Sequence, residues 1–223
     1  MGFQIAIDGP AGAGKSTIAK IVAGKLNFTY MDTGAMYRAM GIAFDENGIL
    51  PDDTEAAREL IDNTDISIRY EDGVQHIYLN GRDVSGEIRT EHAGNMASAV
   101  SRLEKVRERL VELQRELSKS MDVVMDGRDI GTVVLPDADL KIYMVADANV
   151  RARRREAQLR EKGENPDIKQ IEEDLKARDY QDMNRAVSPL KQADDAIYLD
   201  TSDMTIDEVA SKIIDLKETA EKR

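Results

Sequence analysis

Near its start the chain reads Gly9-Pro10-Ala11-Gly12-Ala13-Gly14-Lys15-Ser16. This spacing of glycines, lysine and serine is the pattern G-x-x-x-x-G-K-[ST], which is typical of loops that bind nucleotide phosphates. The apolar run Phe3–Asp8 comes directly before it and indicates a strand. Apolar residues recur at helical spacing after it, at Ile18, Ile21, Val22 and Leu26. The sequence therefore predicts a strand, a glycine-rich loop and a helix, in that order.

The residue types of this loop suit a nucleoside triphosphate. Glycines let the backbone N–H groups point toward phosphate, and the helix N-terminus adds partial positive charge. Lys15 is expected to reach the outer phosphates, and the Ser16 hydroxyl is expected to bind Mg²⁺. The expected ATP-binding residues are Gly9, Pro10, Ala11, Gly12, Ala13, Gly14, Lys15, Ser16 and Thr17. A glycine-rich turn without a ligand is the alternative, and the loop alone does not separate kinases from GTPases or motor ATPases.

Further apolar segments follow, with helical patterns between most of them. The predicted strands are Phe3–Asp8, Phe28–Asp32, Val123–Asp126, Leu140–Val145 and Ala196–Leu199. A later helix carries Leu103, Val106, Leu110, Leu113 and Leu117 on one side. Strands that alternate with helices favour a parallel sheet that is covered on both faces. The predicted fold class is α/β, with a parallel five-stranded sheet flanked by helices.

One region breaks this alternation. Asp65–Tyr70 and Val74–Leu79 have the composition of strands, with Asp72-Gly73 between them and Asn80-Gly81 after them. Asp-Gly and Asn-Gly are strong hairpin signals, because both turn positions can need a positive φ. The sequence predicts a small antiparallel β insert at residues 63–90, within one domain that covers residues 1–223.

Composition narrows the classes of function. The net charge is −12, so the phosphates of a nucleic acid would be repelled over most of the surface, and nonspecific nucleic-acid binding is not expected. The sequence has no cysteine, which excludes disulfides and thiolate metal sites. No signal peptide and no membrane-spanning run is recognised. We expect a cytoplasmic protein that makes no membrane contact and acts as a monomer.

Two arginines directly follow predicted strands. Arg38 comes after the second strand, and Arg128 comes after the third, in Asp126-Gly127-Arg128-Asp129. Ligands bind beyond the carboxyl ends of parallel strands, where the glycine-rich loop also emerges. Convergent arginines suit a dianionic phosphate, which accepts forked hydrogen bonds from them. The alternative is that each arginine pairs with an internal acid such as Asp32 or Asp129.

Arginines are also concentrated on one later helix, at Arg151, Arg153, Arg154, Arg155 and Arg160. Gly163 follows this helix, and Arg178 and Arg185 lie beyond it. A mobile, arginine-bearing lid would exclude water and neutralise charge on a transferring phosphoryl group. Without a ligand the arginines should repel one another and keep the lid open. A solvated helix face is the alternative.

Several segments together resemble bacterial cytidylate kinases: Asp8–Thr17, Asp32–Arg38, Asp83–Thr90, Asp126–Thr132 and Asn184–Leu190. The resemblance runs the length of the chain, with the motifs in the family's order. It implies a monophosphate-binding region over 33–110, which includes the β insert, and a helical lid over 150–185. It also implies Mg²⁺-dependent phosphoryl transfer from ATP to CMP or dCMP, giving ADP and CDP or dCDP, in pyrimidine nucleotide metabolism.

The resemblance also implies roles for single residues. The CMP phosphate would be bound by Thr33, Arg38, Arg128 and Arg185, the ribose by Arg178 and Asp182, and cytosine by Ser98, Arg107 and Asp129. Lys15, Arg128 and Arg185 would be catalytic, and Ser16 would bind the metal. The family often has serine where this chain has Thr33, and the hydroxyl is kept.

The chemistry of cytosine is compatible with these roles. An acid or a hydroxyl can accept from its N4 amine, and an arginine can donate to O2 and N3. Uracil would leave the acceptors of such a site unpaired, which is a strong basis for rejection. From the residues alone, Arg107 either extends to water from the edge of an apolar helix face or reaches a polar partner.

The reaction needs no general base, because the second pKa of a phosphate is about 6 and its oxygen is already ionised near neutral pH. Asp126 is either an outer partner of Mg²⁺ or a structural partner of Arg128. Two other functions stay open: a kinase of this fold with a different acceptor, and a nucleotide switch or regulatory ATPase. The isolated His76 and His92 are interpreted as structural or solvated.

Overall fold

The structure is a computed structural model that describes residues 2–71, 73–161 and 163–222. The chain divides into two compact units. We call residues 1–30 together with 120–223 the core unit, and residues 31–119 the inserted unit. Each unit is described by itself.

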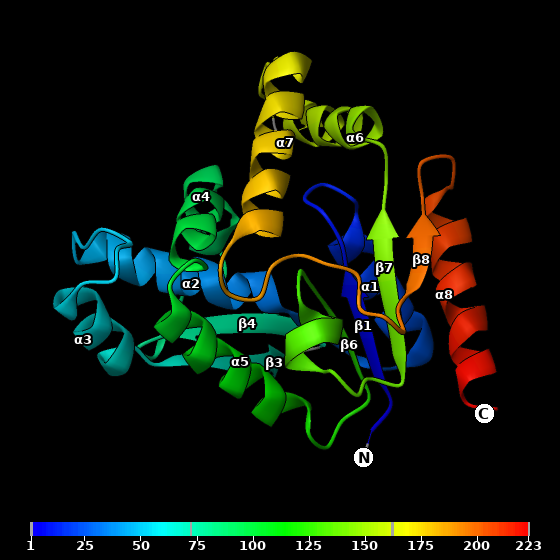
Figure 1. Cartoon of the computed structure of the whole chain (residues 1–223), viewed down its shortest axis with the longest axis horizontal. Coiled ribbons are helices and arrows are strands. Elements are labelled where there is room, and N and C mark those ends of the chain that lie inside the picture. The colour runs from blue at the N-terminus through cyan, green and yellow to red at the C-terminus, as the bar shows by residue number, and fades with distance from the viewer. Residues whose placement is uncertain (1, 72, 162, 223) are drawn as a thin grey trace. The chain divides into compact units, whose positions relative to one another are not determined.

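The core unit is built on a five-stranded parallel sheet, whose edge strand β2 begins in this unit and ends at Asp32 in the inserted unit (Figure 1). The strands lie in the order β2 (Thr29–Asp32), β6 (Val123–Gly127), β1 (Gln4–Asp8), β7 (Leu140–Val145) and β8 (Ile197–Asp200). In the centre, β1 pairs in parallel with both β6 and β7. The predicted sheet is confirmed, and the strand ends differ from the prediction by one residue at most.

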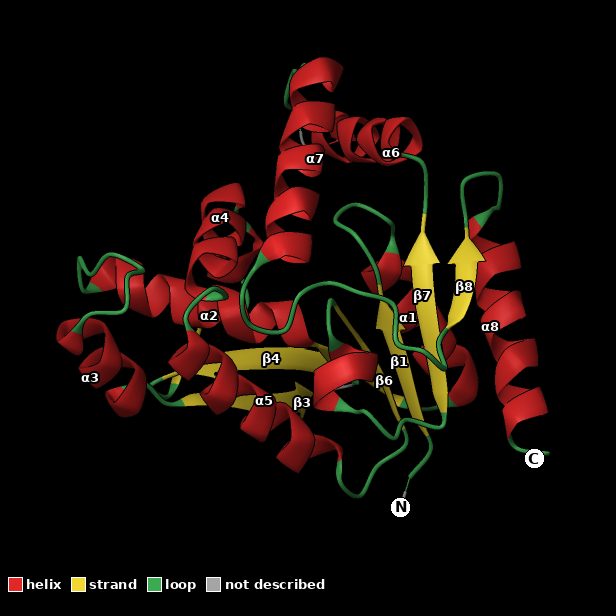
Figure 2. Cartoon of the chain, viewed as in Figure 1, coloured by secondary structure: helices red, strands yellow, loops and turns green. Residues whose placement is uncertain are grey.

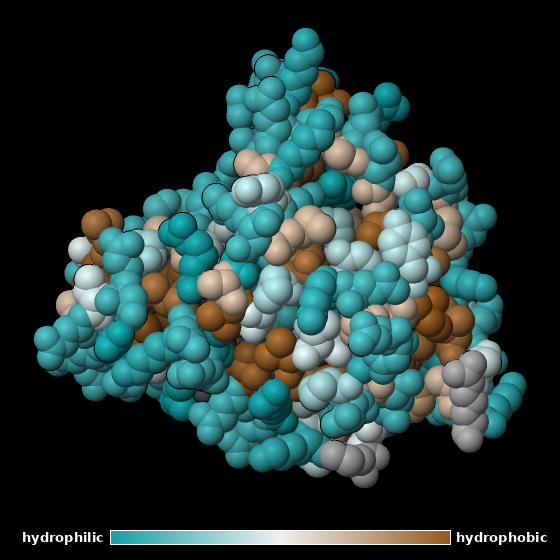
Figure 3. Space-filling model, viewed as in Figure 1, coloured by the Kyte–Doolittle hydropathy of each residue, from teal (hydrophilic) through white to brown (hydrophobic). Residues whose placement is uncertain are grey.

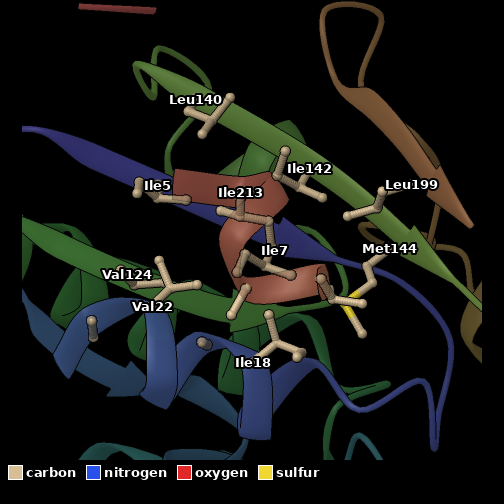
Figure 4. Packing of buried hydrophobic residues seen from close by; sticks show 14 of the residues in the cluster. Ile5, Ile7, Ile18, Val22, Val124, Leu140, Ile142, Met144, Leu199 and Ile213 are labelled. Carbon is tan, nitrogen blue, oxygen red and sulfur yellow. The ribbon is translucent and has the colours of Figure 1, made fainter. Parts of the chain in front are cut away.

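Apolar side chains of the strands pack against helices α1 (Lys15–Leu26) and α8 (Ile206–Ala220). Figure 4 shows Ile7 of β1 close to Ile18 of α1 and Ile213 of α8. Ile7 and Ile213 are fully buried. Burial of one such side chain contributes about 1.5–3 kcal/mol to stability. This packing holds α1 against β1, and it thereby sets the position of the loop that joins them.

The core unit also contains two helices, α6 (Ala148–Glu161) and α7 (Ile168–Asn184), over the range expected for a lid. Helix α6 begins just beyond the carboxyl end of β7 (Figure 2). The two helices share a small apolar cluster that includes Ala152 and Ile171. Between them Gly163 has a φ of 83°, the left-handed conformation that glycine commonly provides after a helix.

The inserted unit contains the predicted antiparallel β insert. Strands β3 (Ile66–Glu71), β4 (Val74–Leu79) and β5 (Arg82–Asp83) form its sheet in that order. The residues Asn80 and Gly81 both have positive φ, as the hairpin prediction requires. Asp72, of the other predicted turn, lies outside the described residues.

The remaining elements of the inserted unit are helical: α2 (Thr33–Glu46), α3 (Glu55–Asn63), the short 3-10 helix Glu87–Arg89, α4 (Glu91–Val100) and α5 (Glu104–Ser118). The predicted leucine-rich helix is α5, where Val106 and Leu110 are buried. Each of α2, α3 and α4 begins with a side-chain cap, from Asp32, Thr54 and Thr90 respectively. Such caps satisfy N–H groups that the first helical turn leaves without a partner.

Hydrophilic side chains cover most of the face drawn in Figure 3, as expected for a chain in which 33% of residues are charged. Over residues 2–71, 73–161 and 163–222, no helix is both long and apolar enough to cross a bilayer.

Candidate nucleotide-binding site

The glycine-rich loop joins the end of β1 at Asp8 to the start of α1 at Lys15. A Cβ on Gly9 would come 1.9 Å from the carbonyl oxygen of Met144 in β7, so a side chain has no room there. Gly14 has a φ of 91° directly before the helix, a conformation that glycine adopts at little cost. The loop thus packs against β7 at Gly9 and continues into the first turn of α1. The N–H groups of this turn can bind phosphate.

Lys15 is folded back over this loop. Its side chain is buried, and Nζ donates a hydrogen bond of 2.8 Å to the carbonyl oxygen of Pro10. Burial, together with the nearby positive charge of Arg128, lowers the pKa of Lys15 to about 7. An anion bound at the loop would stabilise the ammonium form and raise this pKa again.

We expect ATP binding at pH 8 to take up a proton. Lys15 is mostly neutral at that pH in the free protein, because its pKa is lowered to about 7, and bound phosphates would protonate it. The uptake from this group should disappear below pH 6, where Lys15 is already charged. Calorimetric titration with ATP in two buffers of different ionisation enthalpy counts the protons. The Lys15→Arg variant keeps its charge at both pH values. Equal proton uptake at pH 8 by this variant and the wild type would show that the proton does not bind to Lys15.

Asp126 is the fourth residue of β6, and its carboxylate accepts hydrogen bonds from two hydroxyl groups. Ser16 Oγ donates to Asp126 Oδ2 at 2.7 Å, and the Tyr30 hydroxyl donates to Oδ1 at 2.8 Å. A serine hydroxyl beside a carboxylate is a set of hard oxygen ligands that suits Mg²⁺, which usually needs only one or two carboxylates when phosphates supply further ligands. Asp126 therefore accepts from the residue that is expected to bind Mg²⁺, and its role as an outer partner of the metal remains a prediction.

Four predicted site residues form an ion-pair network in the core unit: Arg128, Asp129, Asp182 and Arg185. Arg128 Nε donates to Asp182 Oδ2 at 2.8 Å, and Arg185 Nη2 lies 3.4 Å from Asp129 Oδ1. Burial disfavours the charged form of Asp182. The positive charges of Arg128 and Arg185 favour that form more strongly, so the pKa of Asp182 is lowered. An acid therefore pairs with Arg128, as the alternative foresaw, and this acid is Asp182. A guanidinium has five N–H donors, so Arg128 can keep this bond and still bind phosphate.

Asp8 holds the segment that follows Asp129. Its buried carboxylate accepts hydrogen bonds from the N–H groups of Ile130 at 2.8 Å and Gly131 at 2.7 Å. Burial raises the pKa of Asp8 to about 6, although both hydrogen bonds act in the opposite direction. Our sequence reasoning missed this residue. A charged residue at the end of an otherwise apolar strand was the available signal.

An ion pair between α6 and α7 holds the glycine-rich loop. Arg151 Nη1 donates to Asp179 Oδ2 at 2.6 Å and to the carbonyl oxygen of Ala11 at 2.7 Å. Asp179 Oδ1 accepts from the N–H of the same residue, Ala11, at 2.9 Å. Arg151 and Asp179 thus bind both backbone groups of one loop residue, and neither had been assigned a loop contact from the sequence.

The other arginines of α6 differ in their contacts. Arg154 donates to the carbonyl oxygen of Thr201 at 2.8 Å, and Arg160 pairs with Glu156 one helical turn away at 2.8 Å. Arg151 and Arg160 thus each pair with an acid, whereas Arg154 bonds to a neutral carbonyl group, and a lid that stays open without a ligand remains a prediction. Arg153 is exposed, as a solvated helix face requires.

The inserted unit carries the remaining predicted acceptor residues. Thr33 is buried at the first position of α2, and Arg38, further along that helix, pairs with Asp32 at 2.8 Å. Ser98 is partly buried in α4. Arg107 in α5 is only 3% exposed, and its guanidinium lies 5.6 Å from the centre of the Tyr37 ring. This burial excludes the alternative in which Arg107 extends to water. Arg178, in contrast, belongs to the core unit, where it lies partly buried in α7.

Two solved structures share the fold of this chain. A gluconokinase from Sinorhizobium meliloti superposes with a TM-score of 0.52, over 99% of this chain and 94% of its own, at 12% identity. An uncharacterized protein from Eubacterium ventriosum gives a TM-score of 0.53 over the full length of both chains, at 15% identity. At such identities the likeness concerns the fold alone.

Relatives of known family are much closer in sequence. The cytidylate kinase of Lactobacillus johnsonii is 52% identical over 220 residues, which cover 99% of this chain and 96% of that protein. The cytidylate kinase of Caldicellulosiruptor saccharolyticus is 49% identical over 214 residues, which cover 96% of this chain and 95% of that protein. The sequence model of the family, described as cytidylate kinase, matches residues 5–219. The chain therefore belongs to the cytidylate kinase family.

Proposed function

We propose that this protein transfers the γ-phosphoryl group of ATP to CMP or dCMP, giving ADP and CDP or dCDP in pyrimidine nucleotide metabolism. The observation that carries the proposal is the identity of about half of all residues with cytidylate kinases over nearly the whole chain. The loop with Lys15 and Ser16 between β1 and α1 supports it, because the chain has the parts that a triphosphate donor requires.

Residues of the core unit would bind the donor. The loop from Gly9 to Thr17 would surround the phosphates, and the Lys15 ammonium would neutralise charge at the transferred group. Ser16 Oγ, oriented by Asp126, would bind Mg²⁺. When bound, the metal ion supplies charge neutralisation at the donor phosphates. Arg151 and Asp179 would keep the loop in shape through Ala11.

Residues that match the family's motifs would bind the acceptor. Thr33, Arg38, Arg128 and Arg185 would bind the phosphate of CMP. Cytosine would be bound by Ser98, Arg107 and Asp129, and the ribose by Arg178 and Asp182. These roles rest on the match of each residue to the family's motifs.

The chemical step is a displacement at the γ-phosphorus of ATP. An ionised oxygen of the CMP phosphate forms the new P–O bond, and the bond from γ-phosphorus to the β,γ-bridging oxygen breaks. The electron pair of that bond leaves with ADP. Lys15, Arg128 and Arg185 would stabilise the negative charge that spreads over the transferred group. No side chain has to remove a proton, because the acceptor oxygen is ionised near neutral pH.

An acceptor panel tests this proposal. Release of ADP from ATP is measured with CMP, dCMP, UMP, AMP and GMP at equal concentrations. We expect CMP and dCMP to be used far better than the others. A different preferred acceptor would identify another small-molecule kinase. ATP binding without any acceptor-dependent ADP release would instead favour a nucleotide switch or regulatory ATPase.

Arg107→Ala should weaken the use of CMP much more than the use of ATP. A hydrogen bond to a charged group contributes about 1.5–3 kcal/mol, so kcat/KM for CMP should fall by roughly 10- to 100-fold. KM for ATP should stay close to the wild-type value. Arg109→Ala, at an exposed position of the same helix, is the matched control. Equal losses for the two nucleotides, or a loss as large in the control variant, would speak against a role in cytosine binding.

We further propose that the enzyme acts as a monomer in the cytoplasm. One chain carries every residue named above, and the substrates of the proposed reaction are cytoplasmic nucleotides. Light scattering coupled to gel filtration, with and without both nucleotides, tests the monomer.

A further inference from the structure

Gln75 in strand β4 binds the backbone of a residue far away in the sequence. The N–H of Asp32 donates to Gln75 Oε1 at 2.8 Å, and Gln75 Nε2 donates to the carbonyl oxygen of Asp32 at 3.2 Å. Both residues belong to the inserted unit. Asp32 ends β2, which lies at the edge of its sheet, where backbone groups lack a neighbouring strand. The carboxamide of Gln75 therefore makes the two bonds that a further strand would make.

Asp32 in turn positions the helix that follows it. Its Oδ1 accepts from the N–H of Ala35 at 3.0 Å and thereby caps α2. Its Oδ2 accepts from Arg38 Nη2 at 2.8 Å. Thr33 is the next residue in the chain and the first residue of α2. The conformation of the Asp32 backbone therefore determines the positions of both Thr33 and Arg38.

The paired side chains of Arg38 and Asp32 lie close to Gly34 in the first turn of α2. A Cβ on Gly34 would come 2.9 Å from Arg38 Nη1 and 3.3 Å from Asp32 Oδ1. The guanidinium and the carboxylate thus pack directly against the first turn of α2. A change in the Asp32 backbone would move the guanidinium with it.

We propose that Gln75 is a positioning residue for acceptor binding, and that the β insert serves this reaction by fixing Asp32 and, through it, Thr33 and Arg38. The proposal rests on the proposed function, in which Thr33 and Arg38 bind the phosphate of CMP. It gives the insert a defined role: β3 and β5 hold β4 in a sheet, and β4 presents the carboxamide to Asp32.

The loss of Gln75 should affect acceptor binding and spare the donor. Gln75→Leu keeps a side chain of similar size and removes both hydrogen bonds. Because both hydrogen bonds to the Asp32 backbone are lost, we expect KM for CMP to rise by about 10-fold. The acceptor phosphate is charged before and during transfer, so this loss of uniform binding should leave kcat nearly unchanged. KM for ATP should also stay unchanged, because the donor loop lies in the core unit.

A matched control separates positioning from general weakening of the insert. His76 is the next residue of the same strand, and its Nδ1 lies 3.1 Å from Asp83 Oδ2 of β5. His76→Gln should lower the melting temperature without a change in KM for CMP. Gln75→Glu keeps an acceptor for the Asp32 N–H but loses the donor to the Asp32 carbonyl, and it should also raise KM for CMP. This second variant keeps the proposal testable if Gln75→Leu does not fold.

The full-length protein is assayed with CMP and ATP as the varied substrates, and CMP binding alone is measured by calorimetry. Arg38→Lys is combined with Gln75→Leu, and the combined effect should be smaller than the sum of the single effects, because one residue acts through the other. An unchanged KM for CMP in folded Gln75→Leu, additive effects, or an equal rise in KM for ATP would each overturn the proposal. A wild-type protein that does not use CMP would overturn the proposed function before any variant is measured.

Discussion

Replacement of Lys15 by alanine is expected to lower kcat by about 10²–10³-fold, the range found when one preorganised donor to a developing charge is removed. The Nζ of Lys15 bonds to Pro10 within the glycine-rich loop, so the ammonium belongs to the wall of the donor site. Alanine offers no donor to the transferred phosphoryl group. Turnover with saturating ATP and CMP is the measurement.

The same substitution should leave the fold intact. Burial lowers the pKa of Lys15, which means that the folded protein disfavours its charged form, and removal of the group relieves this cost. The melting temperature should therefore stay the same or rise. Lys25→Ala, in the last turn of the same helix, is the control and should keep full activity. Unchanged turnover in folded Lys15→Ala would remove this lysine from the catalytic residues.

Asp126→Asn is expected to lower activity by about 10- to 100-fold, as is typical for partners that orient a metal ligand. Asparagine has nearly the same shape and can still accept one hydrogen bond from the hydroxyl of Ser16. It lacks the negative charge that would attract Mg²⁺ and orient Ser16 Oγ toward it. The Mg²⁺ concentration for half-maximal activity should rise, and excess Mg²⁺ should restore part of the lost rate.

Tyr30→Phe is the matched control for Asp126. It removes the hydrogen bond of 2.8 Å to Asp126 Oδ1 and leaves the carboxylate charge in place. We expect a much smaller change in the Mg²⁺ requirement. If Asp126→Asn loses activity with the same Mg²⁺ dependence as the wild type, Asp126 serves the structure of the site and does not orient the metal ligand.

The elements of the fold could be predicted from neighbouring residues. The strand before Gly9, the glycine positions and the apolar repeat of α1 lie within one short stretch. The hairpin at Asn80-Gly81 depends on two adjacent residues with positive φ. Backbone conformation and side-chain periodicity are local properties, so a reader of the sequence can recognise them.

Pairings between distant residues could not be predicted in this way. Arg128 was expected to bind either a phosphate or an internal acid such as Asp129, and the acid that pairs with it is Asp182, 54 residues away. Arg151 was assigned to a lid that its own charges would hold open, whereas Asp179 of the next helix neutralises it. An arginine-rich segment has the same sequence whether its charges face water, acids or carbonyl groups.

The sequence by itself determined the α/β order of elements, the phosphate-binding loop and, through the combination of its motifs, the family. Only the tertiary structure decided that Asp8 supports the segment after Asp129, that Arg151 and Asp179 hold Ala11, and that Gln75 supports Asp32. The physical reason is the range of the interactions. Turns and helices form between residues a few positions apart, whereas the partners of Asp8 and Gln75 are 122 and 43 residues away and meet only when the chain has folded.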